Sequence, residues 1–263
     1  MDLILLLLDL SITFKNNKMA KLYRVGGCIR DSILGIESKD IDFAFVLDDV
    51  SDKTIDQGFL EMKTWMTDRG FQIFLETAEM LTIRAKFPIG DANEGLVADF
   101  VLARKEEGYI PGTRNPIVKP GTLEDDLIRR DFTLNALAED SEGNIIDLFN
   151  GIEDLKNGML RTPLNPEITM MDDPLRILRC WRFFVTKGFT IDLKICDAMR
   201  QPGILEKLEK TVSGERIREE LFKMFKHDTV KSLELLSIVE ADIPGMMSLL
   251  FKNGLHLEPS FKK

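Results

Sequence analysis

Two aspartates, Asp40 and Asp42, stand two residues apart in "KDIDFAFV", at the start of an apolar stretch. In a β-strand, side chains two apart share a face, and their Cα atoms lie about 6–7 Å apart. Carboxylates placed in this way can hold two divalent cations for in-line phosphoryl or nucleotidyl transfer. Mg²⁺ is usually held by one or two carboxylates together with substrate phosphates. A strand end that merely carries two exposed aspartates gives the same pattern, so the pair needs support from other residues.

A glycine pair, Gly26-Gly27, precedes these aspartates, between a stretch that favours a strand and one that favours a helix. Without side chains, glycines let backbone N–H groups approach a phosphate, and the N-terminus of a helix favours an anion. The dinucleotide-binding fingerprint G-x-G-x-x-G is absent. The pair therefore indicates either a phosphate-binding turn or only a tight turn.

A third carboxylate, Asp99, stands among apolar residues in "LVADFVLAR". Burying an unpaired charge is costly, so this group needs a metal ion or a basic partner nearby. Beside a metal ion it could act as a general base toward an attacking hydroxyl. The alternative is a strand-end acid that pairs with Arg104.

The stretch "GTLEDDLIRRDFTLNALAED", residues 121–140, is predicted to be helical. On a helix, Asp131 and Asn135 would lie one turn apart on one face. Arg129 and Arg130 supply planar cationic groups that suit phosphate. An acid, an amide and two arginines together suit a ribose hydroxyl and a triphosphate. The alternative is a solvated, charged helix.

Apolar periodicity and turn residues predict the elements that position these groups. Strands are expected over residues 22–26 and 41–47 and in "FQIFLE", "MLTIRAKF" and "LVADFVLAR", and helices over 28–34 and 53–69. Glycines and prolines across residues 104–122 predict a long loop. Further along, apolar residues three and four apart predict helices over 172–188, 193–200, 213–226 and 229–240. The chain therefore reads as an α/β domain to about residue 150, followed by a helical domain.

Composition excludes few classes of function. The 263 residues carry a net charge of −9, which argues against wholesale coating of nucleic acid but is compatible with a local basic groove. Three scattered cysteines and two histidines, without a C-x-x-C, argue against a zinc site. The same cysteine usage fits a reduced, cytoplasmic setting.

The first 18 residues contain an apolar run that is far shorter than the roughly 20 residues needed to span a bilayer. Asp2 and Asp9 stand where a signal peptide would have a positive region, so neither a membrane partner nor secretion is expected. Met19 follows directly before the motif region. We interpret residues 1–18 as an N-terminal extension that the activity does not need.

Taken in order, these motifs resemble class II tRNA nucleotidyltransferases, the CCA-adding enzymes, to which bacterial poly(A) polymerases are closely related. The segments that carry the resemblance are "GGCIRD", "KDIDFAF", "DFVLARKEEGY", "GTLEDDLIRRDFTLNALA", "IIDLFNGIEDLKNGMLR", "DDPLRILRCWRF" and "ERIREEL". They cover about residues 22–225. The resemblance implies a polymerase-β-like nucleotidyltransferase head with a mixed sheet over residues 19–150. An all-α neck with a short or absent body would follow over 151–263.

The resemblance also implies roles for residues. Asp40 and Asp42 would hold Mg²⁺, with Asp99 beside them, and the triphosphate would be lined by Gly26, Gly27, Arg30 and Asp31. The R-R-D-x-x-x-N motif of the family falls on Arg129, Arg130, Asp131 and Asn135, and Asp131 would read the ribose hydroxyls. The expected reaction adds the 3′-terminal CCA of tRNA from CTP and ATP. The loop at about 103–122 matches the flexible loop of enzymes that add the terminal A.

The family's base-reading motif, E-D-x-x-R, corresponds to "DDPLR", in which Asp172 replaces the usual Glu. Pro174 suits the first turn of a helix, and Asp173 and Arg176 would share a face. A carboxylate accepts from an exocyclic amino group and an arginine donates to ring acceptors, a pairing that suits cytosine and adenine. Taken alone, the motif could also be a helix cap with an intrahelical salt bridge.

Two alternatives stay open beside CCA addition. The nucleotide-binding motifs are shared with poly(A) polymerases and with enzymes that add only the terminal A. A non-catalytic RNA-binding module is the alternative of another class. Because the segment after "ERIREEL" is short, tRNA would be held weakly or with the help of a homodimer.

Overall fold

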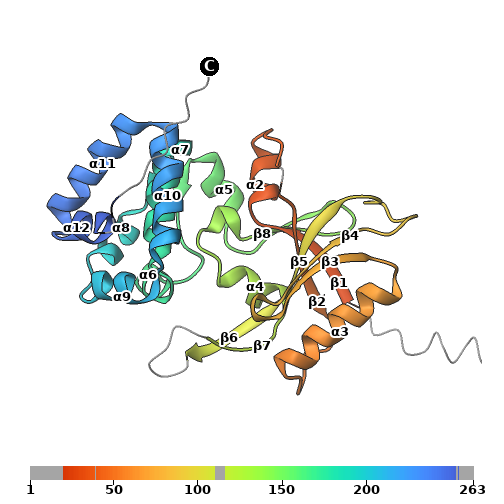
Figure 1. Cartoon of the computed structure of the whole chain (residues 1–263). Coiled ribbons are helices and arrows are strands. Elements are labelled where there is room, and N and C mark those ends of the chain that lie inside the picture. The colour runs from red at the N-terminus through yellow and green to blue at the C-terminus, as the bar shows by residue number, and fades with distance from the viewer. Residues whose placement is uncertain (1–19, 39, 110–115, 253, 255–263) are drawn as a thin grey trace, which may run out of the picture.

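The computed structural model describes residues 20–38, 40–109, 116–252 and 254. The interpretation of residues 1–18 as an extension falls outside this part of the chain. Within it, no helix is long and apolar enough to cross a membrane. Figure 1 shows two lobes side by side, one built on a sheet and one made of helices.

Alternating and continuous apolar stretches form a seven-stranded mixed sheet in the order β3-β4-β5-β2-β1-β8-β9. Only β2 and β5 pair in parallel within it, and the other neighbours are antiparallel. The strands are β1 (Ala20–Val25), β2 (Asp42–Leu47), β3 (Gln72–Thr77), β4 (Thr82–Lys86), β5 (Val97–Leu102), β8 (Leu137–Glu139) and β9 (Ile145–Asp147). The five strands predicted in the first half of the chain are confirmed, as is the mixed sheet.

Two predicted helices accompany this sheet, α2 (Gly27–Ile33) and α3 (Ile55–Asp68). A capping box starts α3, because the Thr54 hydroxyl accepts from Gln57 N–H while the Gln57 side chain accepts from Thr54 N–H. Met62 and Met66 of α3 are fully buried and belong to the same apolar cluster as strand residues such as Phe100. A short 3₁₀ helix, η2 (Ala78–Met80), links β3 to β4. This core fixes the central strands that carry the candidate acids.

The segment predicted as a long loop over 104–122 is largely a two-stranded hairpin. β6 (Arg104–Tyr109) pairs antiparallel with β7 (Pro116–Pro120), and residues 110–115 lie outside the described chain. The prediction is wrong because two prolines stand at the first and last positions of β7, where a two-stranded hairpin tolerates them. At Gly121 a Cβ would lie 2.6 Å from the Arg104 backbone, so only glycine lets the chain return beside the base of the hairpin.

The second lobe is helical, with two short strands. Two elements lead into it from the sheet, α4 (Leu123–Ile128) and η3 (Thr133–Asn135). Its own elements are α5 (Gly151–Lys156), β10 (Met159–Leu160), α6 (Pro166–Asp172), α7 (Leu175–Lys187), β11 (Thr190–Ile191), α8 (Leu193–Met199), α9 (Ile204–Thr211), α10 (Gly214–His227), α11 (Thr229–Asp242) and α12 (Met246–Phe251). The four predicted helices correspond to α7, α8, α10 and α11. The short helices α5, α6, α9 and α12 were not predicted.

The segment after α4 joins the two lobes. Phe132 and Leu134 are fully buried in the same apolar cluster as Trp181 and Phe183 of α7. Gly151 makes this possible, because a Cβ there would lie 2.2 Å from the carbonyl oxygen of Thr133. The expected fold class, a mixed-sheet head followed by an all-α region, is confirmed.

Candidate active site

Two of the candidate carboxylates lie side by side at one end of the central strands. Asp42 is the first residue of β2, and the parallel register places it directly beside Asp99 of β5. Asp40 is exposed and precedes the strand. The expectation that Asp40 and Asp42 belong to one strand is therefore wrong, because β2 begins only at Asp42. We call Asp40, Asp42 and Asp99 the carboxylate edge.

The negative charges of the carboxylate edge repel one another, so a cation bound there would stabilise them. Burial raises the pKa of Asp42 above its ordinary value; the charges of Asp99 and Asp40 add to the rise, and those of Arg130 and Arg84 oppose it. Carboxylate oxygens beside one another are ligands that suit Mg²⁺. In the described part of the chain, no three His, Cys, Asp or Glu side chains form a group that could hold a metal ion. A divalent cation at Asp40 and Asp42 would therefore complete its coordination with water or with oxygens from a substrate.

Asp99 has the basic partner that its sequence context requires, but the partner is Arg84. Nη1 of Arg84 donates to Oδ1 and Oδ2 of Asp99 at 3.3 and 3.0 Å. The two residues face each other across β4 and β5. Arg104 instead pairs with Glu106 at 3.1 Å. The alternative pairing of Asp99 with Arg104 is wrong because Arg104 lies in the separate hairpin.

Gly26 adopts a backbone conformation that suits glycine. Its φ is 81°, and a Cβ would lie 2.7 Å from Nη1 of Arg130. Its N–H donates to the Leu137 carbonyl at 3.1 Å, which fastens the turn to the start of β8. A Cβ on Gly27 would lie 3.3 Å from Nη2 of Arg30. The glycine pair thus makes room for two guanidinium groups beside the turn.

Arg30 and Asp31 are engaged with each other and with the second lobe. Nη2 of Arg30 donates to both oxygens of Asp31 at 2.9 Å, and Nη1 donates to Oδ1 of Asn135 at 2.5 Å. The Arg30 guanidinium also lies 5.1 Å from the centre of the Phe183 ring. Lys187 approaches Asp31 at 3.6 Å. These contacts join α2 to α7, and the predicted contact with a triphosphate stays a prediction.

Asp131 and Asn135 meet without the predicted helix. The helix α4 ends at Ile128, and Asn135 belongs to the 3₁₀ helix η3. Nδ2 of Asn135 nevertheless donates to Oδ1 of Asp131 at 2.9 Å. The helix over 121–140 is wrong because Phe132 and Leu134 must turn inward to enter the core of the second lobe. The turn keeps the acid and the amide together.

Asp131 is a buried anion held by a salt bridge to α7. Its Oδ1 accepts from Phe132 N–H at 2.8 Å, and its Oδ2 pairs with Nη2 of Arg179 at 2.6 Å. Burial alone would raise the pKa of Asp131, but the Arg179 charge and the Asn135 hydrogen bond hold it below its ordinary value. Sequence reasoning missed Arg179, although Arg176, Arg179 and Arg182 recur three apart, as on one face of a helix.

Asp126, also missed, holds the two arginines of the R-R-D motif. It is 1% exposed, and its carboxylate oxygens accept separately from Arg129 and from Arg130, the latter at 2.8 Å. Burial alone would raise the pKa of Asp126, but the charges of Arg130 and Arg129 lower it. The spacing of three and four residues before the arginines is the signal that could have found it. The charged stretch is therefore partly a buried ion cluster, not a solvated helix.

Asp173 lies just before the helix α7 and Arg176 lies in its first turn, and the two make different contacts. Oδ1 of Asp173 accepts from Leu175 N–H, and Oδ2 from Nη2 of Arg216 in α10, both at 3.2 Å. Arg176 donates to the carbonyls of Arg129 and Thr169 at 2.6 and 3.2 Å. Asp173 therefore caps α7, as the alternative reading of the motif expected. The intrahelical salt bridge of that alternative is wrong, because the Asp173 carboxylate pairs with Arg216 of α10 and Arg176 donates to two backbone carbonyls.

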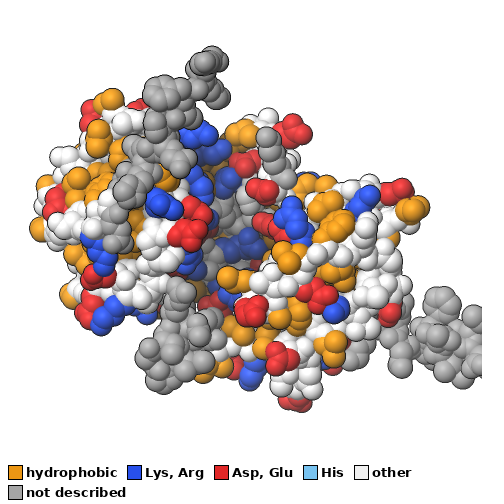
Figure 2. Space-filling view, viewed as in Figure 1, with side chains coloured by type: hydrophobic (Ala, Val, Ile, Leu, Met, Phe, Trp, Pro, Cys, Tyr) orange, Lys and Arg blue, Asp and Glu red, His pale blue; other side chains and the backbone are white. Residues whose placement is uncertain are grey.

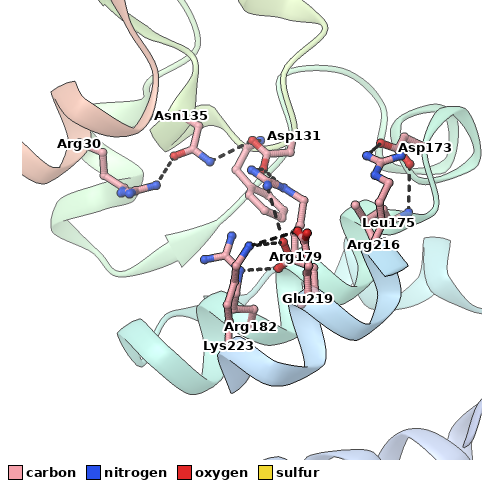
Figure 3. A network of polar contacts seen from close by, with 12 residues as sticks. Arg30, Asp131, Asn135, Asp173, Leu175, Arg179, Arg182, Arg216, Glu219 and Lys223 are labelled. Carbon is pink, nitrogen blue, oxygen red and sulfur yellow. Dashed lines mark hydrogen bonds and ion pairs between the residues drawn. The ribbon is translucent and has the colours of Figure 1, made fainter. Parts of the chain in front are cut away.

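Figure 3 shows how these groups form one polar network across the two lobes, from Arg30 through Asn135 and Asp131 to Arg179. Beyond Arg179 lies buried Glu220 of "ERIREEL", which also pairs with Arg182. The space-filling view in Figure 2 shows the surface hollowed between the lobes, with Lys and Arg side chains gathered there. The arrangement presents carboxylates on the sheet and arginines on the helical side, which suits a nucleotide with its phosphates.

Comparison with known families is consistent with this geometry. The profile of the family described as the poly A polymerase head domain matches residues 22–161, more than half of the chain. The chain therefore belongs to the tRNA nucleotidyltransferase and poly(A) polymerase family, as the sequence motifs predicted.

Individual relatives carry more specific names. A CCA-adding enzyme of Francisella tularensis subsp. tularensis is 31% identical and covers 92% of this chain and 63% of its own length. A tRNA nucleotidyltransferase of Schizosaccharomyces pombe is 34% identical over 80% of this chain and 45% of its own length. The chain spans about half the length of the curated relatives it matches.

Solved structures of similarly named proteins also resemble this chain. The crystal structure of the Bacillus stearothermophilus CCA-adding enzyme in complex with CTP has a TM-score of 0.65 at 26% identity, over 86% of this chain and 50% of that chain. A tRNA nucleotidyltransferase complexed with a primer tRNA and an incoming ATP analog has a TM-score of 0.61 at 30% identity. The match covers 86% of this chain and 60% of that chain.

Proposed function

We propose that the chain is a template-independent nucleotidyltransferase that adds or repairs the 3′-terminal CCA of tRNA from CTP and ATP. The RNA 3′ hydroxyl attacks the α-phosphate of the nucleotide, and pyrophosphate leaves. The observation that carries this proposal is the pairing of Asp42 with Asp99 at the carboxylate edge, beside Gly26 and Arg130. The relatives bound to CTP and to primer tRNA with an ATP analog support the choice of substrates.

The proposed reaction is Mg²⁺-dependent, with Asp40 and Asp42 as the protein ligands. Bound Mg²⁺ would stabilise the charge that develops on the attacking and leaving oxygens. Asp99 lies beside Asp42 and can accept the proton of the attacking hydroxyl. Arg130, held by Asp126 and seated against Gly26, supplies a cation for the triphosphate.

The sugar and the base would be recognised between the lobes. Asp131 is proposed to accept from a ribose hydroxyl, and since its oxygens already accept from Asn135 and Arg179, one of these contacts would be shared or exchanged. Asp173 would accept from the amino group of cytosine or adenine, and Arg176 would donate to a ring acceptor. With Asp172 in place of the usual Glu, selectivity is expected to persist with altered positioning.

A poly(A) polymerase, or an enzyme that adds only the terminal A, is the second candidate, because the matching family profile is described as a poly A polymerase head domain. The deciding experiment supplies purified protein with tRNA that ends at the discriminator base, tRNA that ends in CC, and plain oligo(A). Each RNA receives one labelled nucleotide at a time. Addition of C and then A, with a stop at CCA, is expected. Unlimited A addition would support a poly(A) polymerase, and addition of A to tRNA ending in CC without C addition would identify an A-adding enzyme.

The remaining alternative, a non-catalytic RNA-binding module, predicts RNA binding without incorporation of any nucleotide in the same assay. A homodimer that helps to hold tRNA is a separate expectation. Light scattering of the protein with and without tRNA would test it, and a single copy per tRNA would contradict it.

A further inference from the structure

Arg84 is a charged residue at the carboxylate edge to which neither the motifs nor the proposed mechanism gives a role. It lies on β4, and the antiparallel register places it opposite Asp99 of β5, which in turn lies beside Asp42 of β2. The row Asp42, Asp99, Arg84 therefore crosses three adjacent strands. Neighbouring strands lie about 4.8 Å apart, so the guanidinium is within range of both acids.

The contact of Arg84 is directed at the carboxylate itself. One nitrogen, Nη1, donates to both oxygens of Asp99 at 3.3 and 3.0 Å. A divalent cation that used Asp99 would have to share these oxygens with the guanidinium or displace it. The charge of Arg84 also acts on Asp42, where it opposes the effect of Asp99.

We infer that Arg84 is a positioning residue that serves as a built-in counter-cation of Asp99 and competes with a divalent cation for that carboxylate. The inference rests on the proposed function and extends its metal site, because it takes Asp99, which lies beside Asp42, as a further carboxylate that a cation at Asp42 contacts. Arg84 would keep Asp99 aligned while no metal is bound and would set how strongly the edge binds one. About half of the Arg84 side chain is exposed, so it can swing away without opening the core.

The test is the affinity of the metal alone, measured with Mn²⁺ by electron paramagnetic resonance on the full chain without RNA or nucleotide. The variant Arg84→Gln removes the competing charge and is expected to bind Mn²⁺ about twofold to fivefold more tightly, the range for a half-exposed ion pair. Structural damage would weaken metal binding, so the sign of the change separates the two effects. Lys86→Gln is the matched control, since Lys86 lies two residues along β4 on the same face, opposite Val97.

A double variant shows whether Arg84 acts through Asp99. Asp99→Asn should weaken Mn²⁺ binding, and adding Arg84→Gln to it should produce no further tightening. Equal or weaker Mn²⁺ binding by Arg84→Gln, relative to Lys86→Gln, would overturn the inference, as would full tightening in the Asp99→Asn background. The readout needs no nucleotide incorporation. A protein that binds Mn²⁺ as expected but adds no nucleotide would refute the proposed function and leave this inference standing.

Discussion

Gly26 shows how a single residue couples the turn to the rest of the candidate site. Gly26→Ala would place a methyl group at φ 81°, against Nη1 of Arg130. Backbone strain should lower the free energy of unfolding by about 1–2 kcal/mol, and displacement of Arg130 should weaken nucleotide incorporation about tenfold or more. Denaturant titration and the KM for nucleotide measure the two effects.

Gly35→Ala is the matched control for this substitution. Gly35 also has a positive φ, of 70°, but a Cβ there meets nothing within 4 Å. It should lose similar stability and keep its KM. Equal KM values for the two variants would contradict the role of Arg130 beside the turn.

Asp131 gives a prediction for pH dependence. Its folded-state pKa is lowered, so the folded protein binds this proton less strongly than the unfolded chain. The stability from Asp131 is therefore complete above the ordinary carboxyl pKa of about 4 and is lost as pH falls through the lowered value. Asp131→Asn should cost about 2–3 kcal/mol at pH 7, less than a fully buried pair because a third of Arg179 is exposed.

Denaturant titrations at pH 7 and at pH 3.5 check this expectation. The difference in unfolding free energy between the native protein and Asp131→Asn should be smaller at the lower pH. An equal difference at both values would show that the ionised form of Asp131 is not what stabilises the fold.

At the scale of elements, the helices α7 and α10 together hold the residues that we propose read the base. Asp173 at the start of α7 is held by Arg216 of α10, while Arg176 is tied to the carbonyl of Arg129 in the segment after α4. Arg216→Ala should release the Asp173 carboxylate and reduce the preference for CTP and ATP over UTP and GTP about threefold to tenfold, because a free carboxylate can rotate. Competition between labelled nucleotides measures this ratio.

The control for this change lies on the same helix. Arg218 is exposed two residues further along α10, so Arg218→Ala removes the same charge away from Asp173. Its nucleotide preference should equal that of the native protein. If Arg216→Ala lost activity toward all four nucleotides in equal proportion, the contact would be structural and would not determine selectivity.

At the scale of the whole molecule, the sequence predicted which elements form each lobe better than it predicted how those elements pair and pack. Periodicity located β2, β5, α3 and α7, because each buries an apolar face that its own residues define. It did not predict the hairpin β6–β7, whose pairing depends on backbone contacts that proline and glycine obscure. The predicted helix over 121–140 failed because packing of Phe132 against the second lobe overrides local propensity.

The candidate site was predicted by residue type, but its partners were not. Asp42 and Asp99 were identified separately, and only the register of β2 and β5 places them together. Arg84, Arg179 and Arg216 are 15, 48 and 43 residues from the acids they hold, and no local pattern fixes such pairs. Asp126 is the exception, since its spacing to Arg129 and Arg130 is visible in the sequence.

The most direct test of the central claim is nucleotide incorporation by Asp42→Ala. The claim is that the carboxylate edge performs the chemistry, so incorporation into tRNA ending in CC should fall a hundredfold or more, about the loss seen when a group that stabilises transition-state charge is removed. Circular dichroism and RNA binding should stay unchanged. Asp48→Ala, just past the other end of β2 and exposed, should incorporate like the native protein. Retained incorporation by Asp42→Ala would contradict the account.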